Sequence, residues 1–185
     1  MFTMKKIIST ISVWMLTGIS LVIAEQVQGP GLGQAATAED IRNWEISVMP
    51  DGRGLPSGEG DAVRGAEVYT QKCLSCHGPK GEGASADQLA FAEMGLTDEW
   101  PEKTVGTYWP YATTLFDFNR RSMPTQAPGS LTNDETYAVT AYILYLNGII
   151  DENEVLNASN LAKIRMPNRD GFIDVYSKRK RNKHQ

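Results

Sequence analysis

Cys73-Leu74-Ser75-Cys76-His77 is the stretch from which the rest of this sequence can be interpreted. It reads C-x-x-C-H, the spacing of a c-type haem attachment site. Thiols at this spacing can each add to a vinyl group of one porphyrin, and the histidine that follows can then reach the iron. Cys73 and Cys76 are the chain's two cysteines, and His184 is its second histidine. The motif therefore predicts one covalently bound haem c, held by Cys73 and Cys76, with His77 as an axial ligand of the iron.

Other functions of a C-x-x-C pair fit the chain less well. A zinc site would need both histidines, and His184 lies far from the motif in a basic tail. A thioredoxin-like pair follows a strand in a βαβ unit, and the sequence contains no such pattern. The haem interpretation is therefore preferred over a zinc half-site, a redox pair or a simple disulfide.

Methionine is the natural second axial ligand, because His/Met ligation raises the reduction potential and suits electron transfer. Bis-histidine ligation would require His184 to fold back from the tail. Met123 lies between the haem motif and a later helical segment, so its loop can cross the far face of the haem, and the proline after it favours an extended backbone. We predict Met123 as the sixth ligand. Core or surface roles are preferred for the other methionines beyond residue 24: Met49, Met94 and Met166.

Helical signals surround the motif. Gly60-Asp61 can cap a helix over residues 62–74, and small residues on its apolar face would let another helix approach closely. Thr132 and Glu135 form a capping box that opens a helix ending near Leu146. A third helical stretch begins around 109–111 and ends at Arg120-Arg121, which either contact haem propionates or lie in solvent.

Composition and the chain ends define the remaining organisation. The chain has 185 residues, 41% hydrophobic and 22% charged, and its net charge of −4 argues against a nucleic-acid binder. Lys5 and Lys6 precede an uncharged apolar run, so residues 1–24 read as a signal peptide cleaved before Glu25, with an uncleaved anchor as the alternative. Export implies a periplasmic protein.

We expect an extended arm over 25–59, a haem domain over 60–148, and a C-terminal wrap with a basic tail over 149–185. The tail is either solvated or a docking element, so membrane contact is at most peripheral.

Residues 60–148 resemble class I c-type cytochromes in their helix, C-x-x-C-H, loop, Met-Pro and final helix. A narrower resemblance, to the SoxD cytochromes, covers nearly the whole chain after residue 24. It rests on Gly-Leu-Gly at 31–33, Trp44-Glu45-Ile46, and the segments 50–56, 101–110, 120–124 and 134–142. The chain departs from SoxD in having one C-x-x-C-H where SoxD has two haem domains. It also shows no Gly-Pro-Leu-type element in residues 84–96.

The resemblance implies an all-α fold in which several helices wrap one haem, with His77 and Met123 as axial ligands. It also implies an electron-accepting partner of a molybdenum-containing sulfite or sulfur dehydrogenase, which passes electrons to a downstream cytochrome or oxidase. We expect such a protein to carry single electrons and not to catalyse sulfur chemistry by itself. The alternatives are a general electron carrier serving other enzymes and, in a different class, a catalytic or sensory haem protein with an open sixth site.

Overall fold

A computed structural model describes residues 31–175 of the chain. The predicted signal peptide, the basic tail and His184 lie outside the described residues. Contacts divide the chain between Thr37 and Ala38, and residues 31–37 contain no helix or strand. No helix in the described part is both long and apolar enough to cross a membrane.

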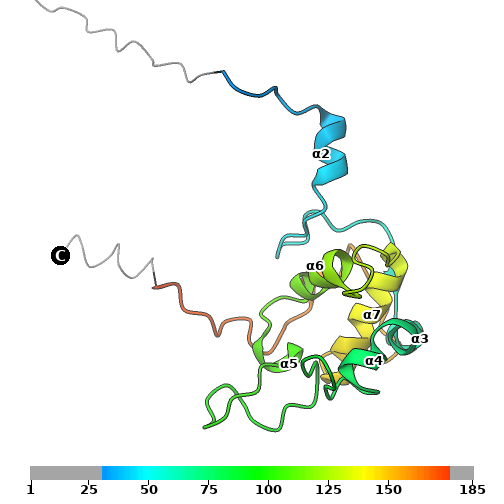
Figure 1. Cartoon of the computed structure of the whole chain (residues 1–185). Helices are drawn as coiled ribbons and strands as arrows, with labels where there is room; N and C mark the ends of the chain where they lie inside the picture. The colour runs from blue at the N-terminus through cyan, green and yellow to red at the C-terminus, as the bar shows by residue number, and fades with distance from the viewer. Residues whose placement is uncertain (1–30, 176–185) are drawn as a thin grey trace, which may run out of the picture. The chain divides into compact units, whose positions relative to one another are not determined.

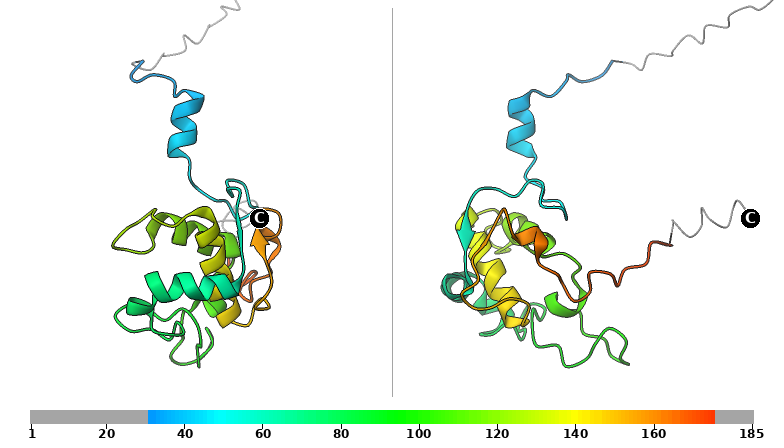
Figure 2. Two further views of the ribbon diagram at one scale, coloured as in Figure 1. Left: turned by 90° about the vertical axis from the view of Figure 1, so that its right-hand side faces the viewer. Right: turned by 180° about the vertical axis from the view of Figure 1, so that it is seen from behind.

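Two crossed helices organise the domain, α3 (Ala62–Lys72) and α7 (Asn133–Leu146) (Figures 1 and 2). Asp61 caps α3 by accepting a hydrogen bond from the Arg64 amide. The helices approach closely because α3 presents glycine at the crossing. A Cβ added to Gly65 would lie 2.7 Å from Cβ of Tyr142 and would collide with the Ala138 carbonyl. This confirms the expected close approach through small residues.

Helix α7 is buried along most of its length. The expected capping box is present, with the Thr132 hydroxyl and the Glu135 carboxylate each accepting a backbone amide hydrogen bond. Helix α6 (Ala112–Ser122) packs beside it, and the rings of Phe116 and Tyr137 meet with centroids 4.5 Å apart. The short helix α4 (Leu74–His77) contains most of the haem motif, and a second short helix, α5 (Val105–Tyr108), precedes α6.

A short sheet departs from the all-α prediction. Strand β1 (Glu59–Gly60) pairs antiparallel with β2 (Leu156–Asn157). After β2 the chain forms a 3₁₀ helix, η1 (Leu161–Lys163). Leu156 of β2, Leu161 of η1 and Met166 beyond it are almost completely buried. The C-terminal segment therefore supplies core side chains as well as wrapping the domain. The fold is mostly helical with little strand.

The segment before β1 is attached to the domain by specific hydrogen bonds. The Val48 amide donates to the buried Asp117 carboxylate at 2.9 Å, and Arg120 donates to the Ile46 carbonyl at 3.2 Å. Tyr137 donates its hydroxyl hydrogen bond to the Pro56 carbonyl. A helix that the sequence did not predict, α2 (Ala38–Trp44), precedes these contacts. The predicted domain boundaries at 59/60 and 148/149 stay predictions.

Candidate haem site

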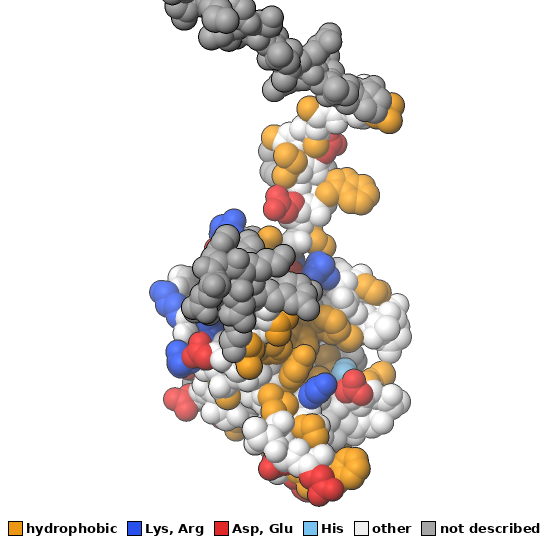
Figure 3. Space-filling model, turned by 90° about the vertical axis from the view of Figure 1, so that its left-hand side faces the viewer, with side chains coloured by type: hydrophobic (Ala, Val, Ile, Leu, Met, Phe, Trp, Pro, Cys, Tyr) orange, Lys and Arg blue, Asp and Glu red, His pale blue; other side chains and the backbone are white. Residues whose placement is uncertain are grey.

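A cavity of about 380 Å³ lies between the haem motif and the C-terminal end of α6. Cys73, Cys76, His77 and Met123 all line it. Figure 3 shows an opening surrounded by hydrophobic side chains, with the pale blue of the single described histidine inside it. The apolar lining comes from residues far apart in the sequence: Leu89, Val105, Trp109, Leu115, Phe118, Leu131, Val139 and Ile143.

The backbone turns sharply at the motif so that its functional side chains face one space. Helix α3 ends at Lys72, and Cys73 leaves helical geometry with φ −123° and ψ −36°. The short helix α4 then brings the amides of Cys76 and His77 within 3.1 and 3.0 Å of the Cys73 carbonyl. Neither cysteine takes part in a disulfide, so both sulfurs are available for attachment. The break at Cys73 also ends α3 sooner than the helix predicted over residues 62–74.

The orientation of the His77 ring is fixed by a backbone carbonyl. Nδ1 of His77 lies 2.8 Å from the carbonyl oxygen of Asp87. A carbonyl can only accept, so Nδ1 carries the proton and Nε2 is the nitrogen left to bind a metal. The loop that supplies this carbonyl is tied to the motif, because the Ala86 amide donates to the Cys76 carbonyl at 2.9 Å.

Sequence reasoning did not identify this acceptor. Class I cytochromes were expected to place a Gly-Pro-Leu-type element here, and residues 84–96 contain none. In the structure the acceptor is the carbonyl of Asp87, in the segment Ala86-Asp87-Gln88 that lines the cavity. A backbone carbonyl has no residue-type signature, so the sequence offered no signal for it.

The four methionines considered above have different environments. Met123 lines the cavity, and its amide donates to the Asn119 carbonyl at the end of α6. Met166 is buried in the core with 1% of its surface exposed, whereas Met49 and Met94 are 39% and 40% exposed. None of these three lines the cavity. The geometry therefore favours Met123 over the other methionines of the described region.

The arginines proposed for propionate contact lie elsewhere. The Arg121 guanidinium pairs with the Asp117 carboxylate, and neither Arg120 nor Arg121 lines the cavity. The cations that do line it are Lys72 and Lys103. Lys72 forms an ion pair with Glu135 at 2.9 Å, and the Lys103 ammonium lies 5.4 Å from the centre of the Tyr108 ring.

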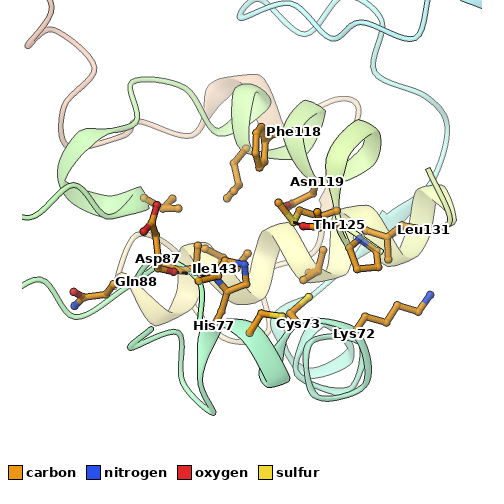
Figure 4. Close-up of a pocket in the computed structure, with 18 of the residues that line it drawn as sticks. Lys72, Cys73, His77, Asp87, Gln88, Phe118, Asn119, Thr125, Leu131 and Ile143 are labelled. Carbon is orange, nitrogen blue, oxygen red and sulfur yellow. Dashed lines mark hydrogen bonds between the residues drawn. The ribbon is translucent and has the colours of Figure 1, made fainter. Parts of the chain in front are cut away.

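These residues fit a covalently attached haem. The cavity volume falls in the range of about 300–1,000 Å³ that cofactor sites occupy. Figure 4 shows Cys73 and His77 on one side, and Phe118, Asn119 and Thr125 on the other. One wall of the cavity thus offers the thiols of Cys73 and Cys76 and the unprotonated Nε2 of His77. The loop that follows α6 offers the thioether of Met123. Apolar side chains between them suit the faces of a porphyrin.

Comparisons with known proteins agree with this site. The cytochrome c family model matches residues 62–147. A chain in the crystal structure of the sulfane dehydrogenase SoxCD from Paracoccus pantotrophus superposes with a TM-score of 0.75. That chain is 40% identical, and the match covers 85% of the present chain and 78% of that one. The protein therefore belongs to the cytochrome c family, whose cofactor is haem c. Within the family it is related to this SoxCD chain, which confirms the resemblance to SoxD cytochromes.

Two curated relatives also match part of the chain. The thiosulfate dehydrogenase of Stutzerimonas stutzeri is 26% identical over 110 residues, which are 59% of this chain and 34% of that protein. The thiosulfate dehydrogenase of Allochromatium vinosum is 27% identical over 105 residues, which are 54% of this chain and 38% of that protein. The chain thus matches little more than a third of the length of either enzyme. All three relatives are named as dehydrogenases of sulfur compounds.

Proposed function

We propose that this protein is a periplasmic monohaem cytochrome that carries single electrons, with haem c attached through Cys73 and Cys76 and ligated by His77 and Met123. The observation that carries the proposal is the convergence of these four side chains on one apolar cavity. When bound there, the haem iron supplies a site that gains or loses one electron. The predicted signal segment over residues 1–24 supports a periplasmic location.

The chain's own residues adapt this site to electron transfer. The Asp87 carbonyl holds the proton of His77 Nδ1, which keeps the ring in one orientation and makes it a better donor. A thioether from Met123 favours the reduced state and so raises the potential. If His77 and Met123 both bound the iron, no coordination position would be left for a substrate. Trp109, Leu115 and Phe118 contribute apolar side chains to the cavity wall.

We infer that the electron donor is a molybdenum-containing sulfite or sulfur dehydrogenase. The likeness to a chain of SoxCD, at 40% identity over 85% of the chain, supports this partner. Each addition of one oxygen atom from water to such a sulfur substrate releases two electrons and two protons. This protein would receive the electrons one at a time and pass each to a downstream cytochrome or oxidase. A general carrier that serves other dehydrogenases would use the same site with different partners.

A second candidate function is thiosulfate oxidation by the haem protein itself. The two relatives named thiosulfate dehydrogenase favour it. It would require a substrate to reach the iron, and hence an open or displaceable sixth position. The presence of Met123 in the cavity supports the electron carrier over this alternative.

Reduction kinetics separate the two functions. Oxidised protein is mixed with sulfite or thiosulfate, alone or with catalytic amounts of the organism's molybdenum sulfur dehydrogenase, and haem reduction is followed by absorbance. We expect slow or no reduction by either substrate alone and rapid reduction once the dehydrogenase is added. Ascorbate is the control that establishes a reducible haem in every sample. Rapid reduction by thiosulfate or sulfite without a partner would contradict the carrier function and favour an enzyme.

A further inference from the structure

The proposed sulfur ligand has a hydrogen-bond donor of its own. Thr125 Oγ1 lies 3.6 Å from Sδ of Met123 and donates to it. A thioether sulfur carries no hydrogen and acts only as a weak acceptor, so the direction of this bond is fixed. Both residues line the cavity, and Figure 4 shows Thr125 beside Asn119 on the side facing His77.

The backbone holds this donor and acceptor in place. The Met123 amide donates to the Asn119 carbonyl at 3.1 Å, which anchors the methionine to the last turn of α6. The Ala127 amide donates to the Pro124 carbonyl at 2.9 Å, so Thr125 occupies the first central position of a tight turn. The Ser130 amide then donates to the Ala127 carbonyl. The contact between Thr125 and Met123 therefore joins two anchored segments.

A hydrogen bond to the sulfur changes how strongly the sulfur donates an electron pair to a metal. Sulfur in a thioether has two lone pairs, so one can accept the Thr125 hydroxyl while the other is directed to a metal. The hydroxyl withdraws electron density from the sulfur and makes it a weaker donor. A weaker donor stabilises the more electron-poor, oxidised iron less, which raises the reduction potential. The same bond selects which lone pair faces the cavity.

We propose that Thr125 is a positioning residue that raises the reduction potential of the haem through its hydrogen bond to Met123 Sδ. The inference rests on the proposed function, and specifically on Met123 as the sixth ligand. Hydrogen bonds to a metal ligand tune the metal site by changing the basicity of that ligand. Thr125 thereby contributes to the driving force for taking an electron from the donor.

The test compares variants of the purified holoprotein by redox titration and by the sulfur–iron charge-transfer band of the oxidised state. Thr125→Val keeps the shape of the side chain and removes the hydroxyl, so the midpoint potential should fall and the band should shift. Thr125→Ser keeps the hydroxyl and should retain both wild-type values. Thr114→Val is the matched control, an exposed threonine on α6 that does not line the cavity. Wild-type values for Thr125→Val, or equal changes in Thr125→Ser, would overturn the role of Thr125.

Met123→Ala distinguishes failure of this inference from failure of the ligand assignment. Loss of the band in Met123→Ala, with wild-type values in Thr125→Val, would reject Thr125 alone. A band that survives in Met123→Ala, or that is absent from the wild type, would reject Met123 as the ligand and the Thr125 role with it.

Discussion

At the scale of single residues, Cys73, Cys76 and His77 act as a unit because one short turn of backbone presents all three. The Cys73 carbonyl accepts from the amides of both Cys76 and His77, so the two sulfurs and the imidazole have a fixed separation. These positions were predictable from sequence, because haem attachment demands particular side chains at a particular spacing. The Asp87 carbonyl that orients His77 was not predictable, because any residue can supply a carbonyl.

Covalent attachment gives a direct prediction for the cysteines. The double variant Cys73→Ala, Cys76→Ala has no thiol that can form a thioether, so its haem stain should disappear on a denaturing gel. Ser75→Ala, which changes one of the two residues between the cysteine positions, should keep the stain. Extraction of haem from the wild type by acidified ketone would contradict covalent attachment.

At the scale of secondary structure, the site depends on the crossing of α3 and α7. Helix α3 carries the haem motif at its end, and α7 contributes Val139 and Ile143 to the cavity wall. The crossing is close because Gly65 faces the backbone of Ala138. Any displacement of α3 would therefore move Cys73 and His77 relative to the opposite wall.

Gly65→Ala should destabilise the protein by this mechanism. Overpacking a well-packed contact costs about 1–3 kcal/mol in the free energy of unfolding, and here the added methyl group meets backbone that cannot rotate away. Denaturant unfolding of the holoprotein measures the loss. Gly95→Ala is the control, because its added Cβ would meet one side-chain atom, Asp98 Oδ2, at 3.3 Å. Equal stability of the two variants would mean that the helix crossing is not tightly packed.

The start of α7 makes stability depend on pH. The Thr132 amide and the Lys72 ammonium both lower the pKa of Glu135 below its usual value of 4.5. Ionised Glu135 therefore stabilises the folded chain above that pH, and the contribution is lost as pH falls through the lowered folded-state pKa.

Glu135→Gln tests this dependence. Glutamine can keep the capping hydrogen bond but cannot pair with Lys72, so the variant should lose less than about 1 kcal/mol of stability at neutral pH. The difference from wild type should shrink as pH falls below 4.5 in unfolding experiments across pH. Glu67→Gln, at an exposed position on α3, should show no such trend. A constant difference at every pH would exclude the ion pair as its cause.

Capping residues made the main helices predictable from sequence. Elements without such residues, in the C-terminal segment, were not predicted. Asp61, Thr132 and Glu135 are capping residues whose side chains mark where a helix begins, and each is found in that role. The C-terminal segment buries Leu156, Leu161 and Met166 from a strand, a 3₁₀ helix and a loop. Side chains spaced in this way follow neither the helical nor the strand period, so their burial depends on tertiary contacts that sequence patterns do not encode.

At the scale of the whole molecule, the described chain builds one cavity from segments that are distant in sequence. Cys73 and His77 come from the turn after α3, Met123 from the end of α6, and Ile143 from α7. The sequence predicted the first three as site residues from their types and order. It did not predict that the segment from 46 to 56 would be hydrogen-bonded to α6 and α7, because those bonds involve backbone groups of Ile46, Val48 and Pro56.

The proposed electron carrier requires that this cavity hold a haem whose iron is ligated by both His77 and Met123. The most direct measurement is the absorption spectrum of the oxidised full-length holoprotein, compared between wild type, Met123→Ala and Met49→Ala. We expect a sulfur–iron charge-transfer band in the wild type, its complete loss with a lower reduction potential in Met123→Ala, and no change in Met49→Ala. A wild-type protein without the band, or a Met123→Ala variant that keeps it, would exclude Met123 as the sixth ligand.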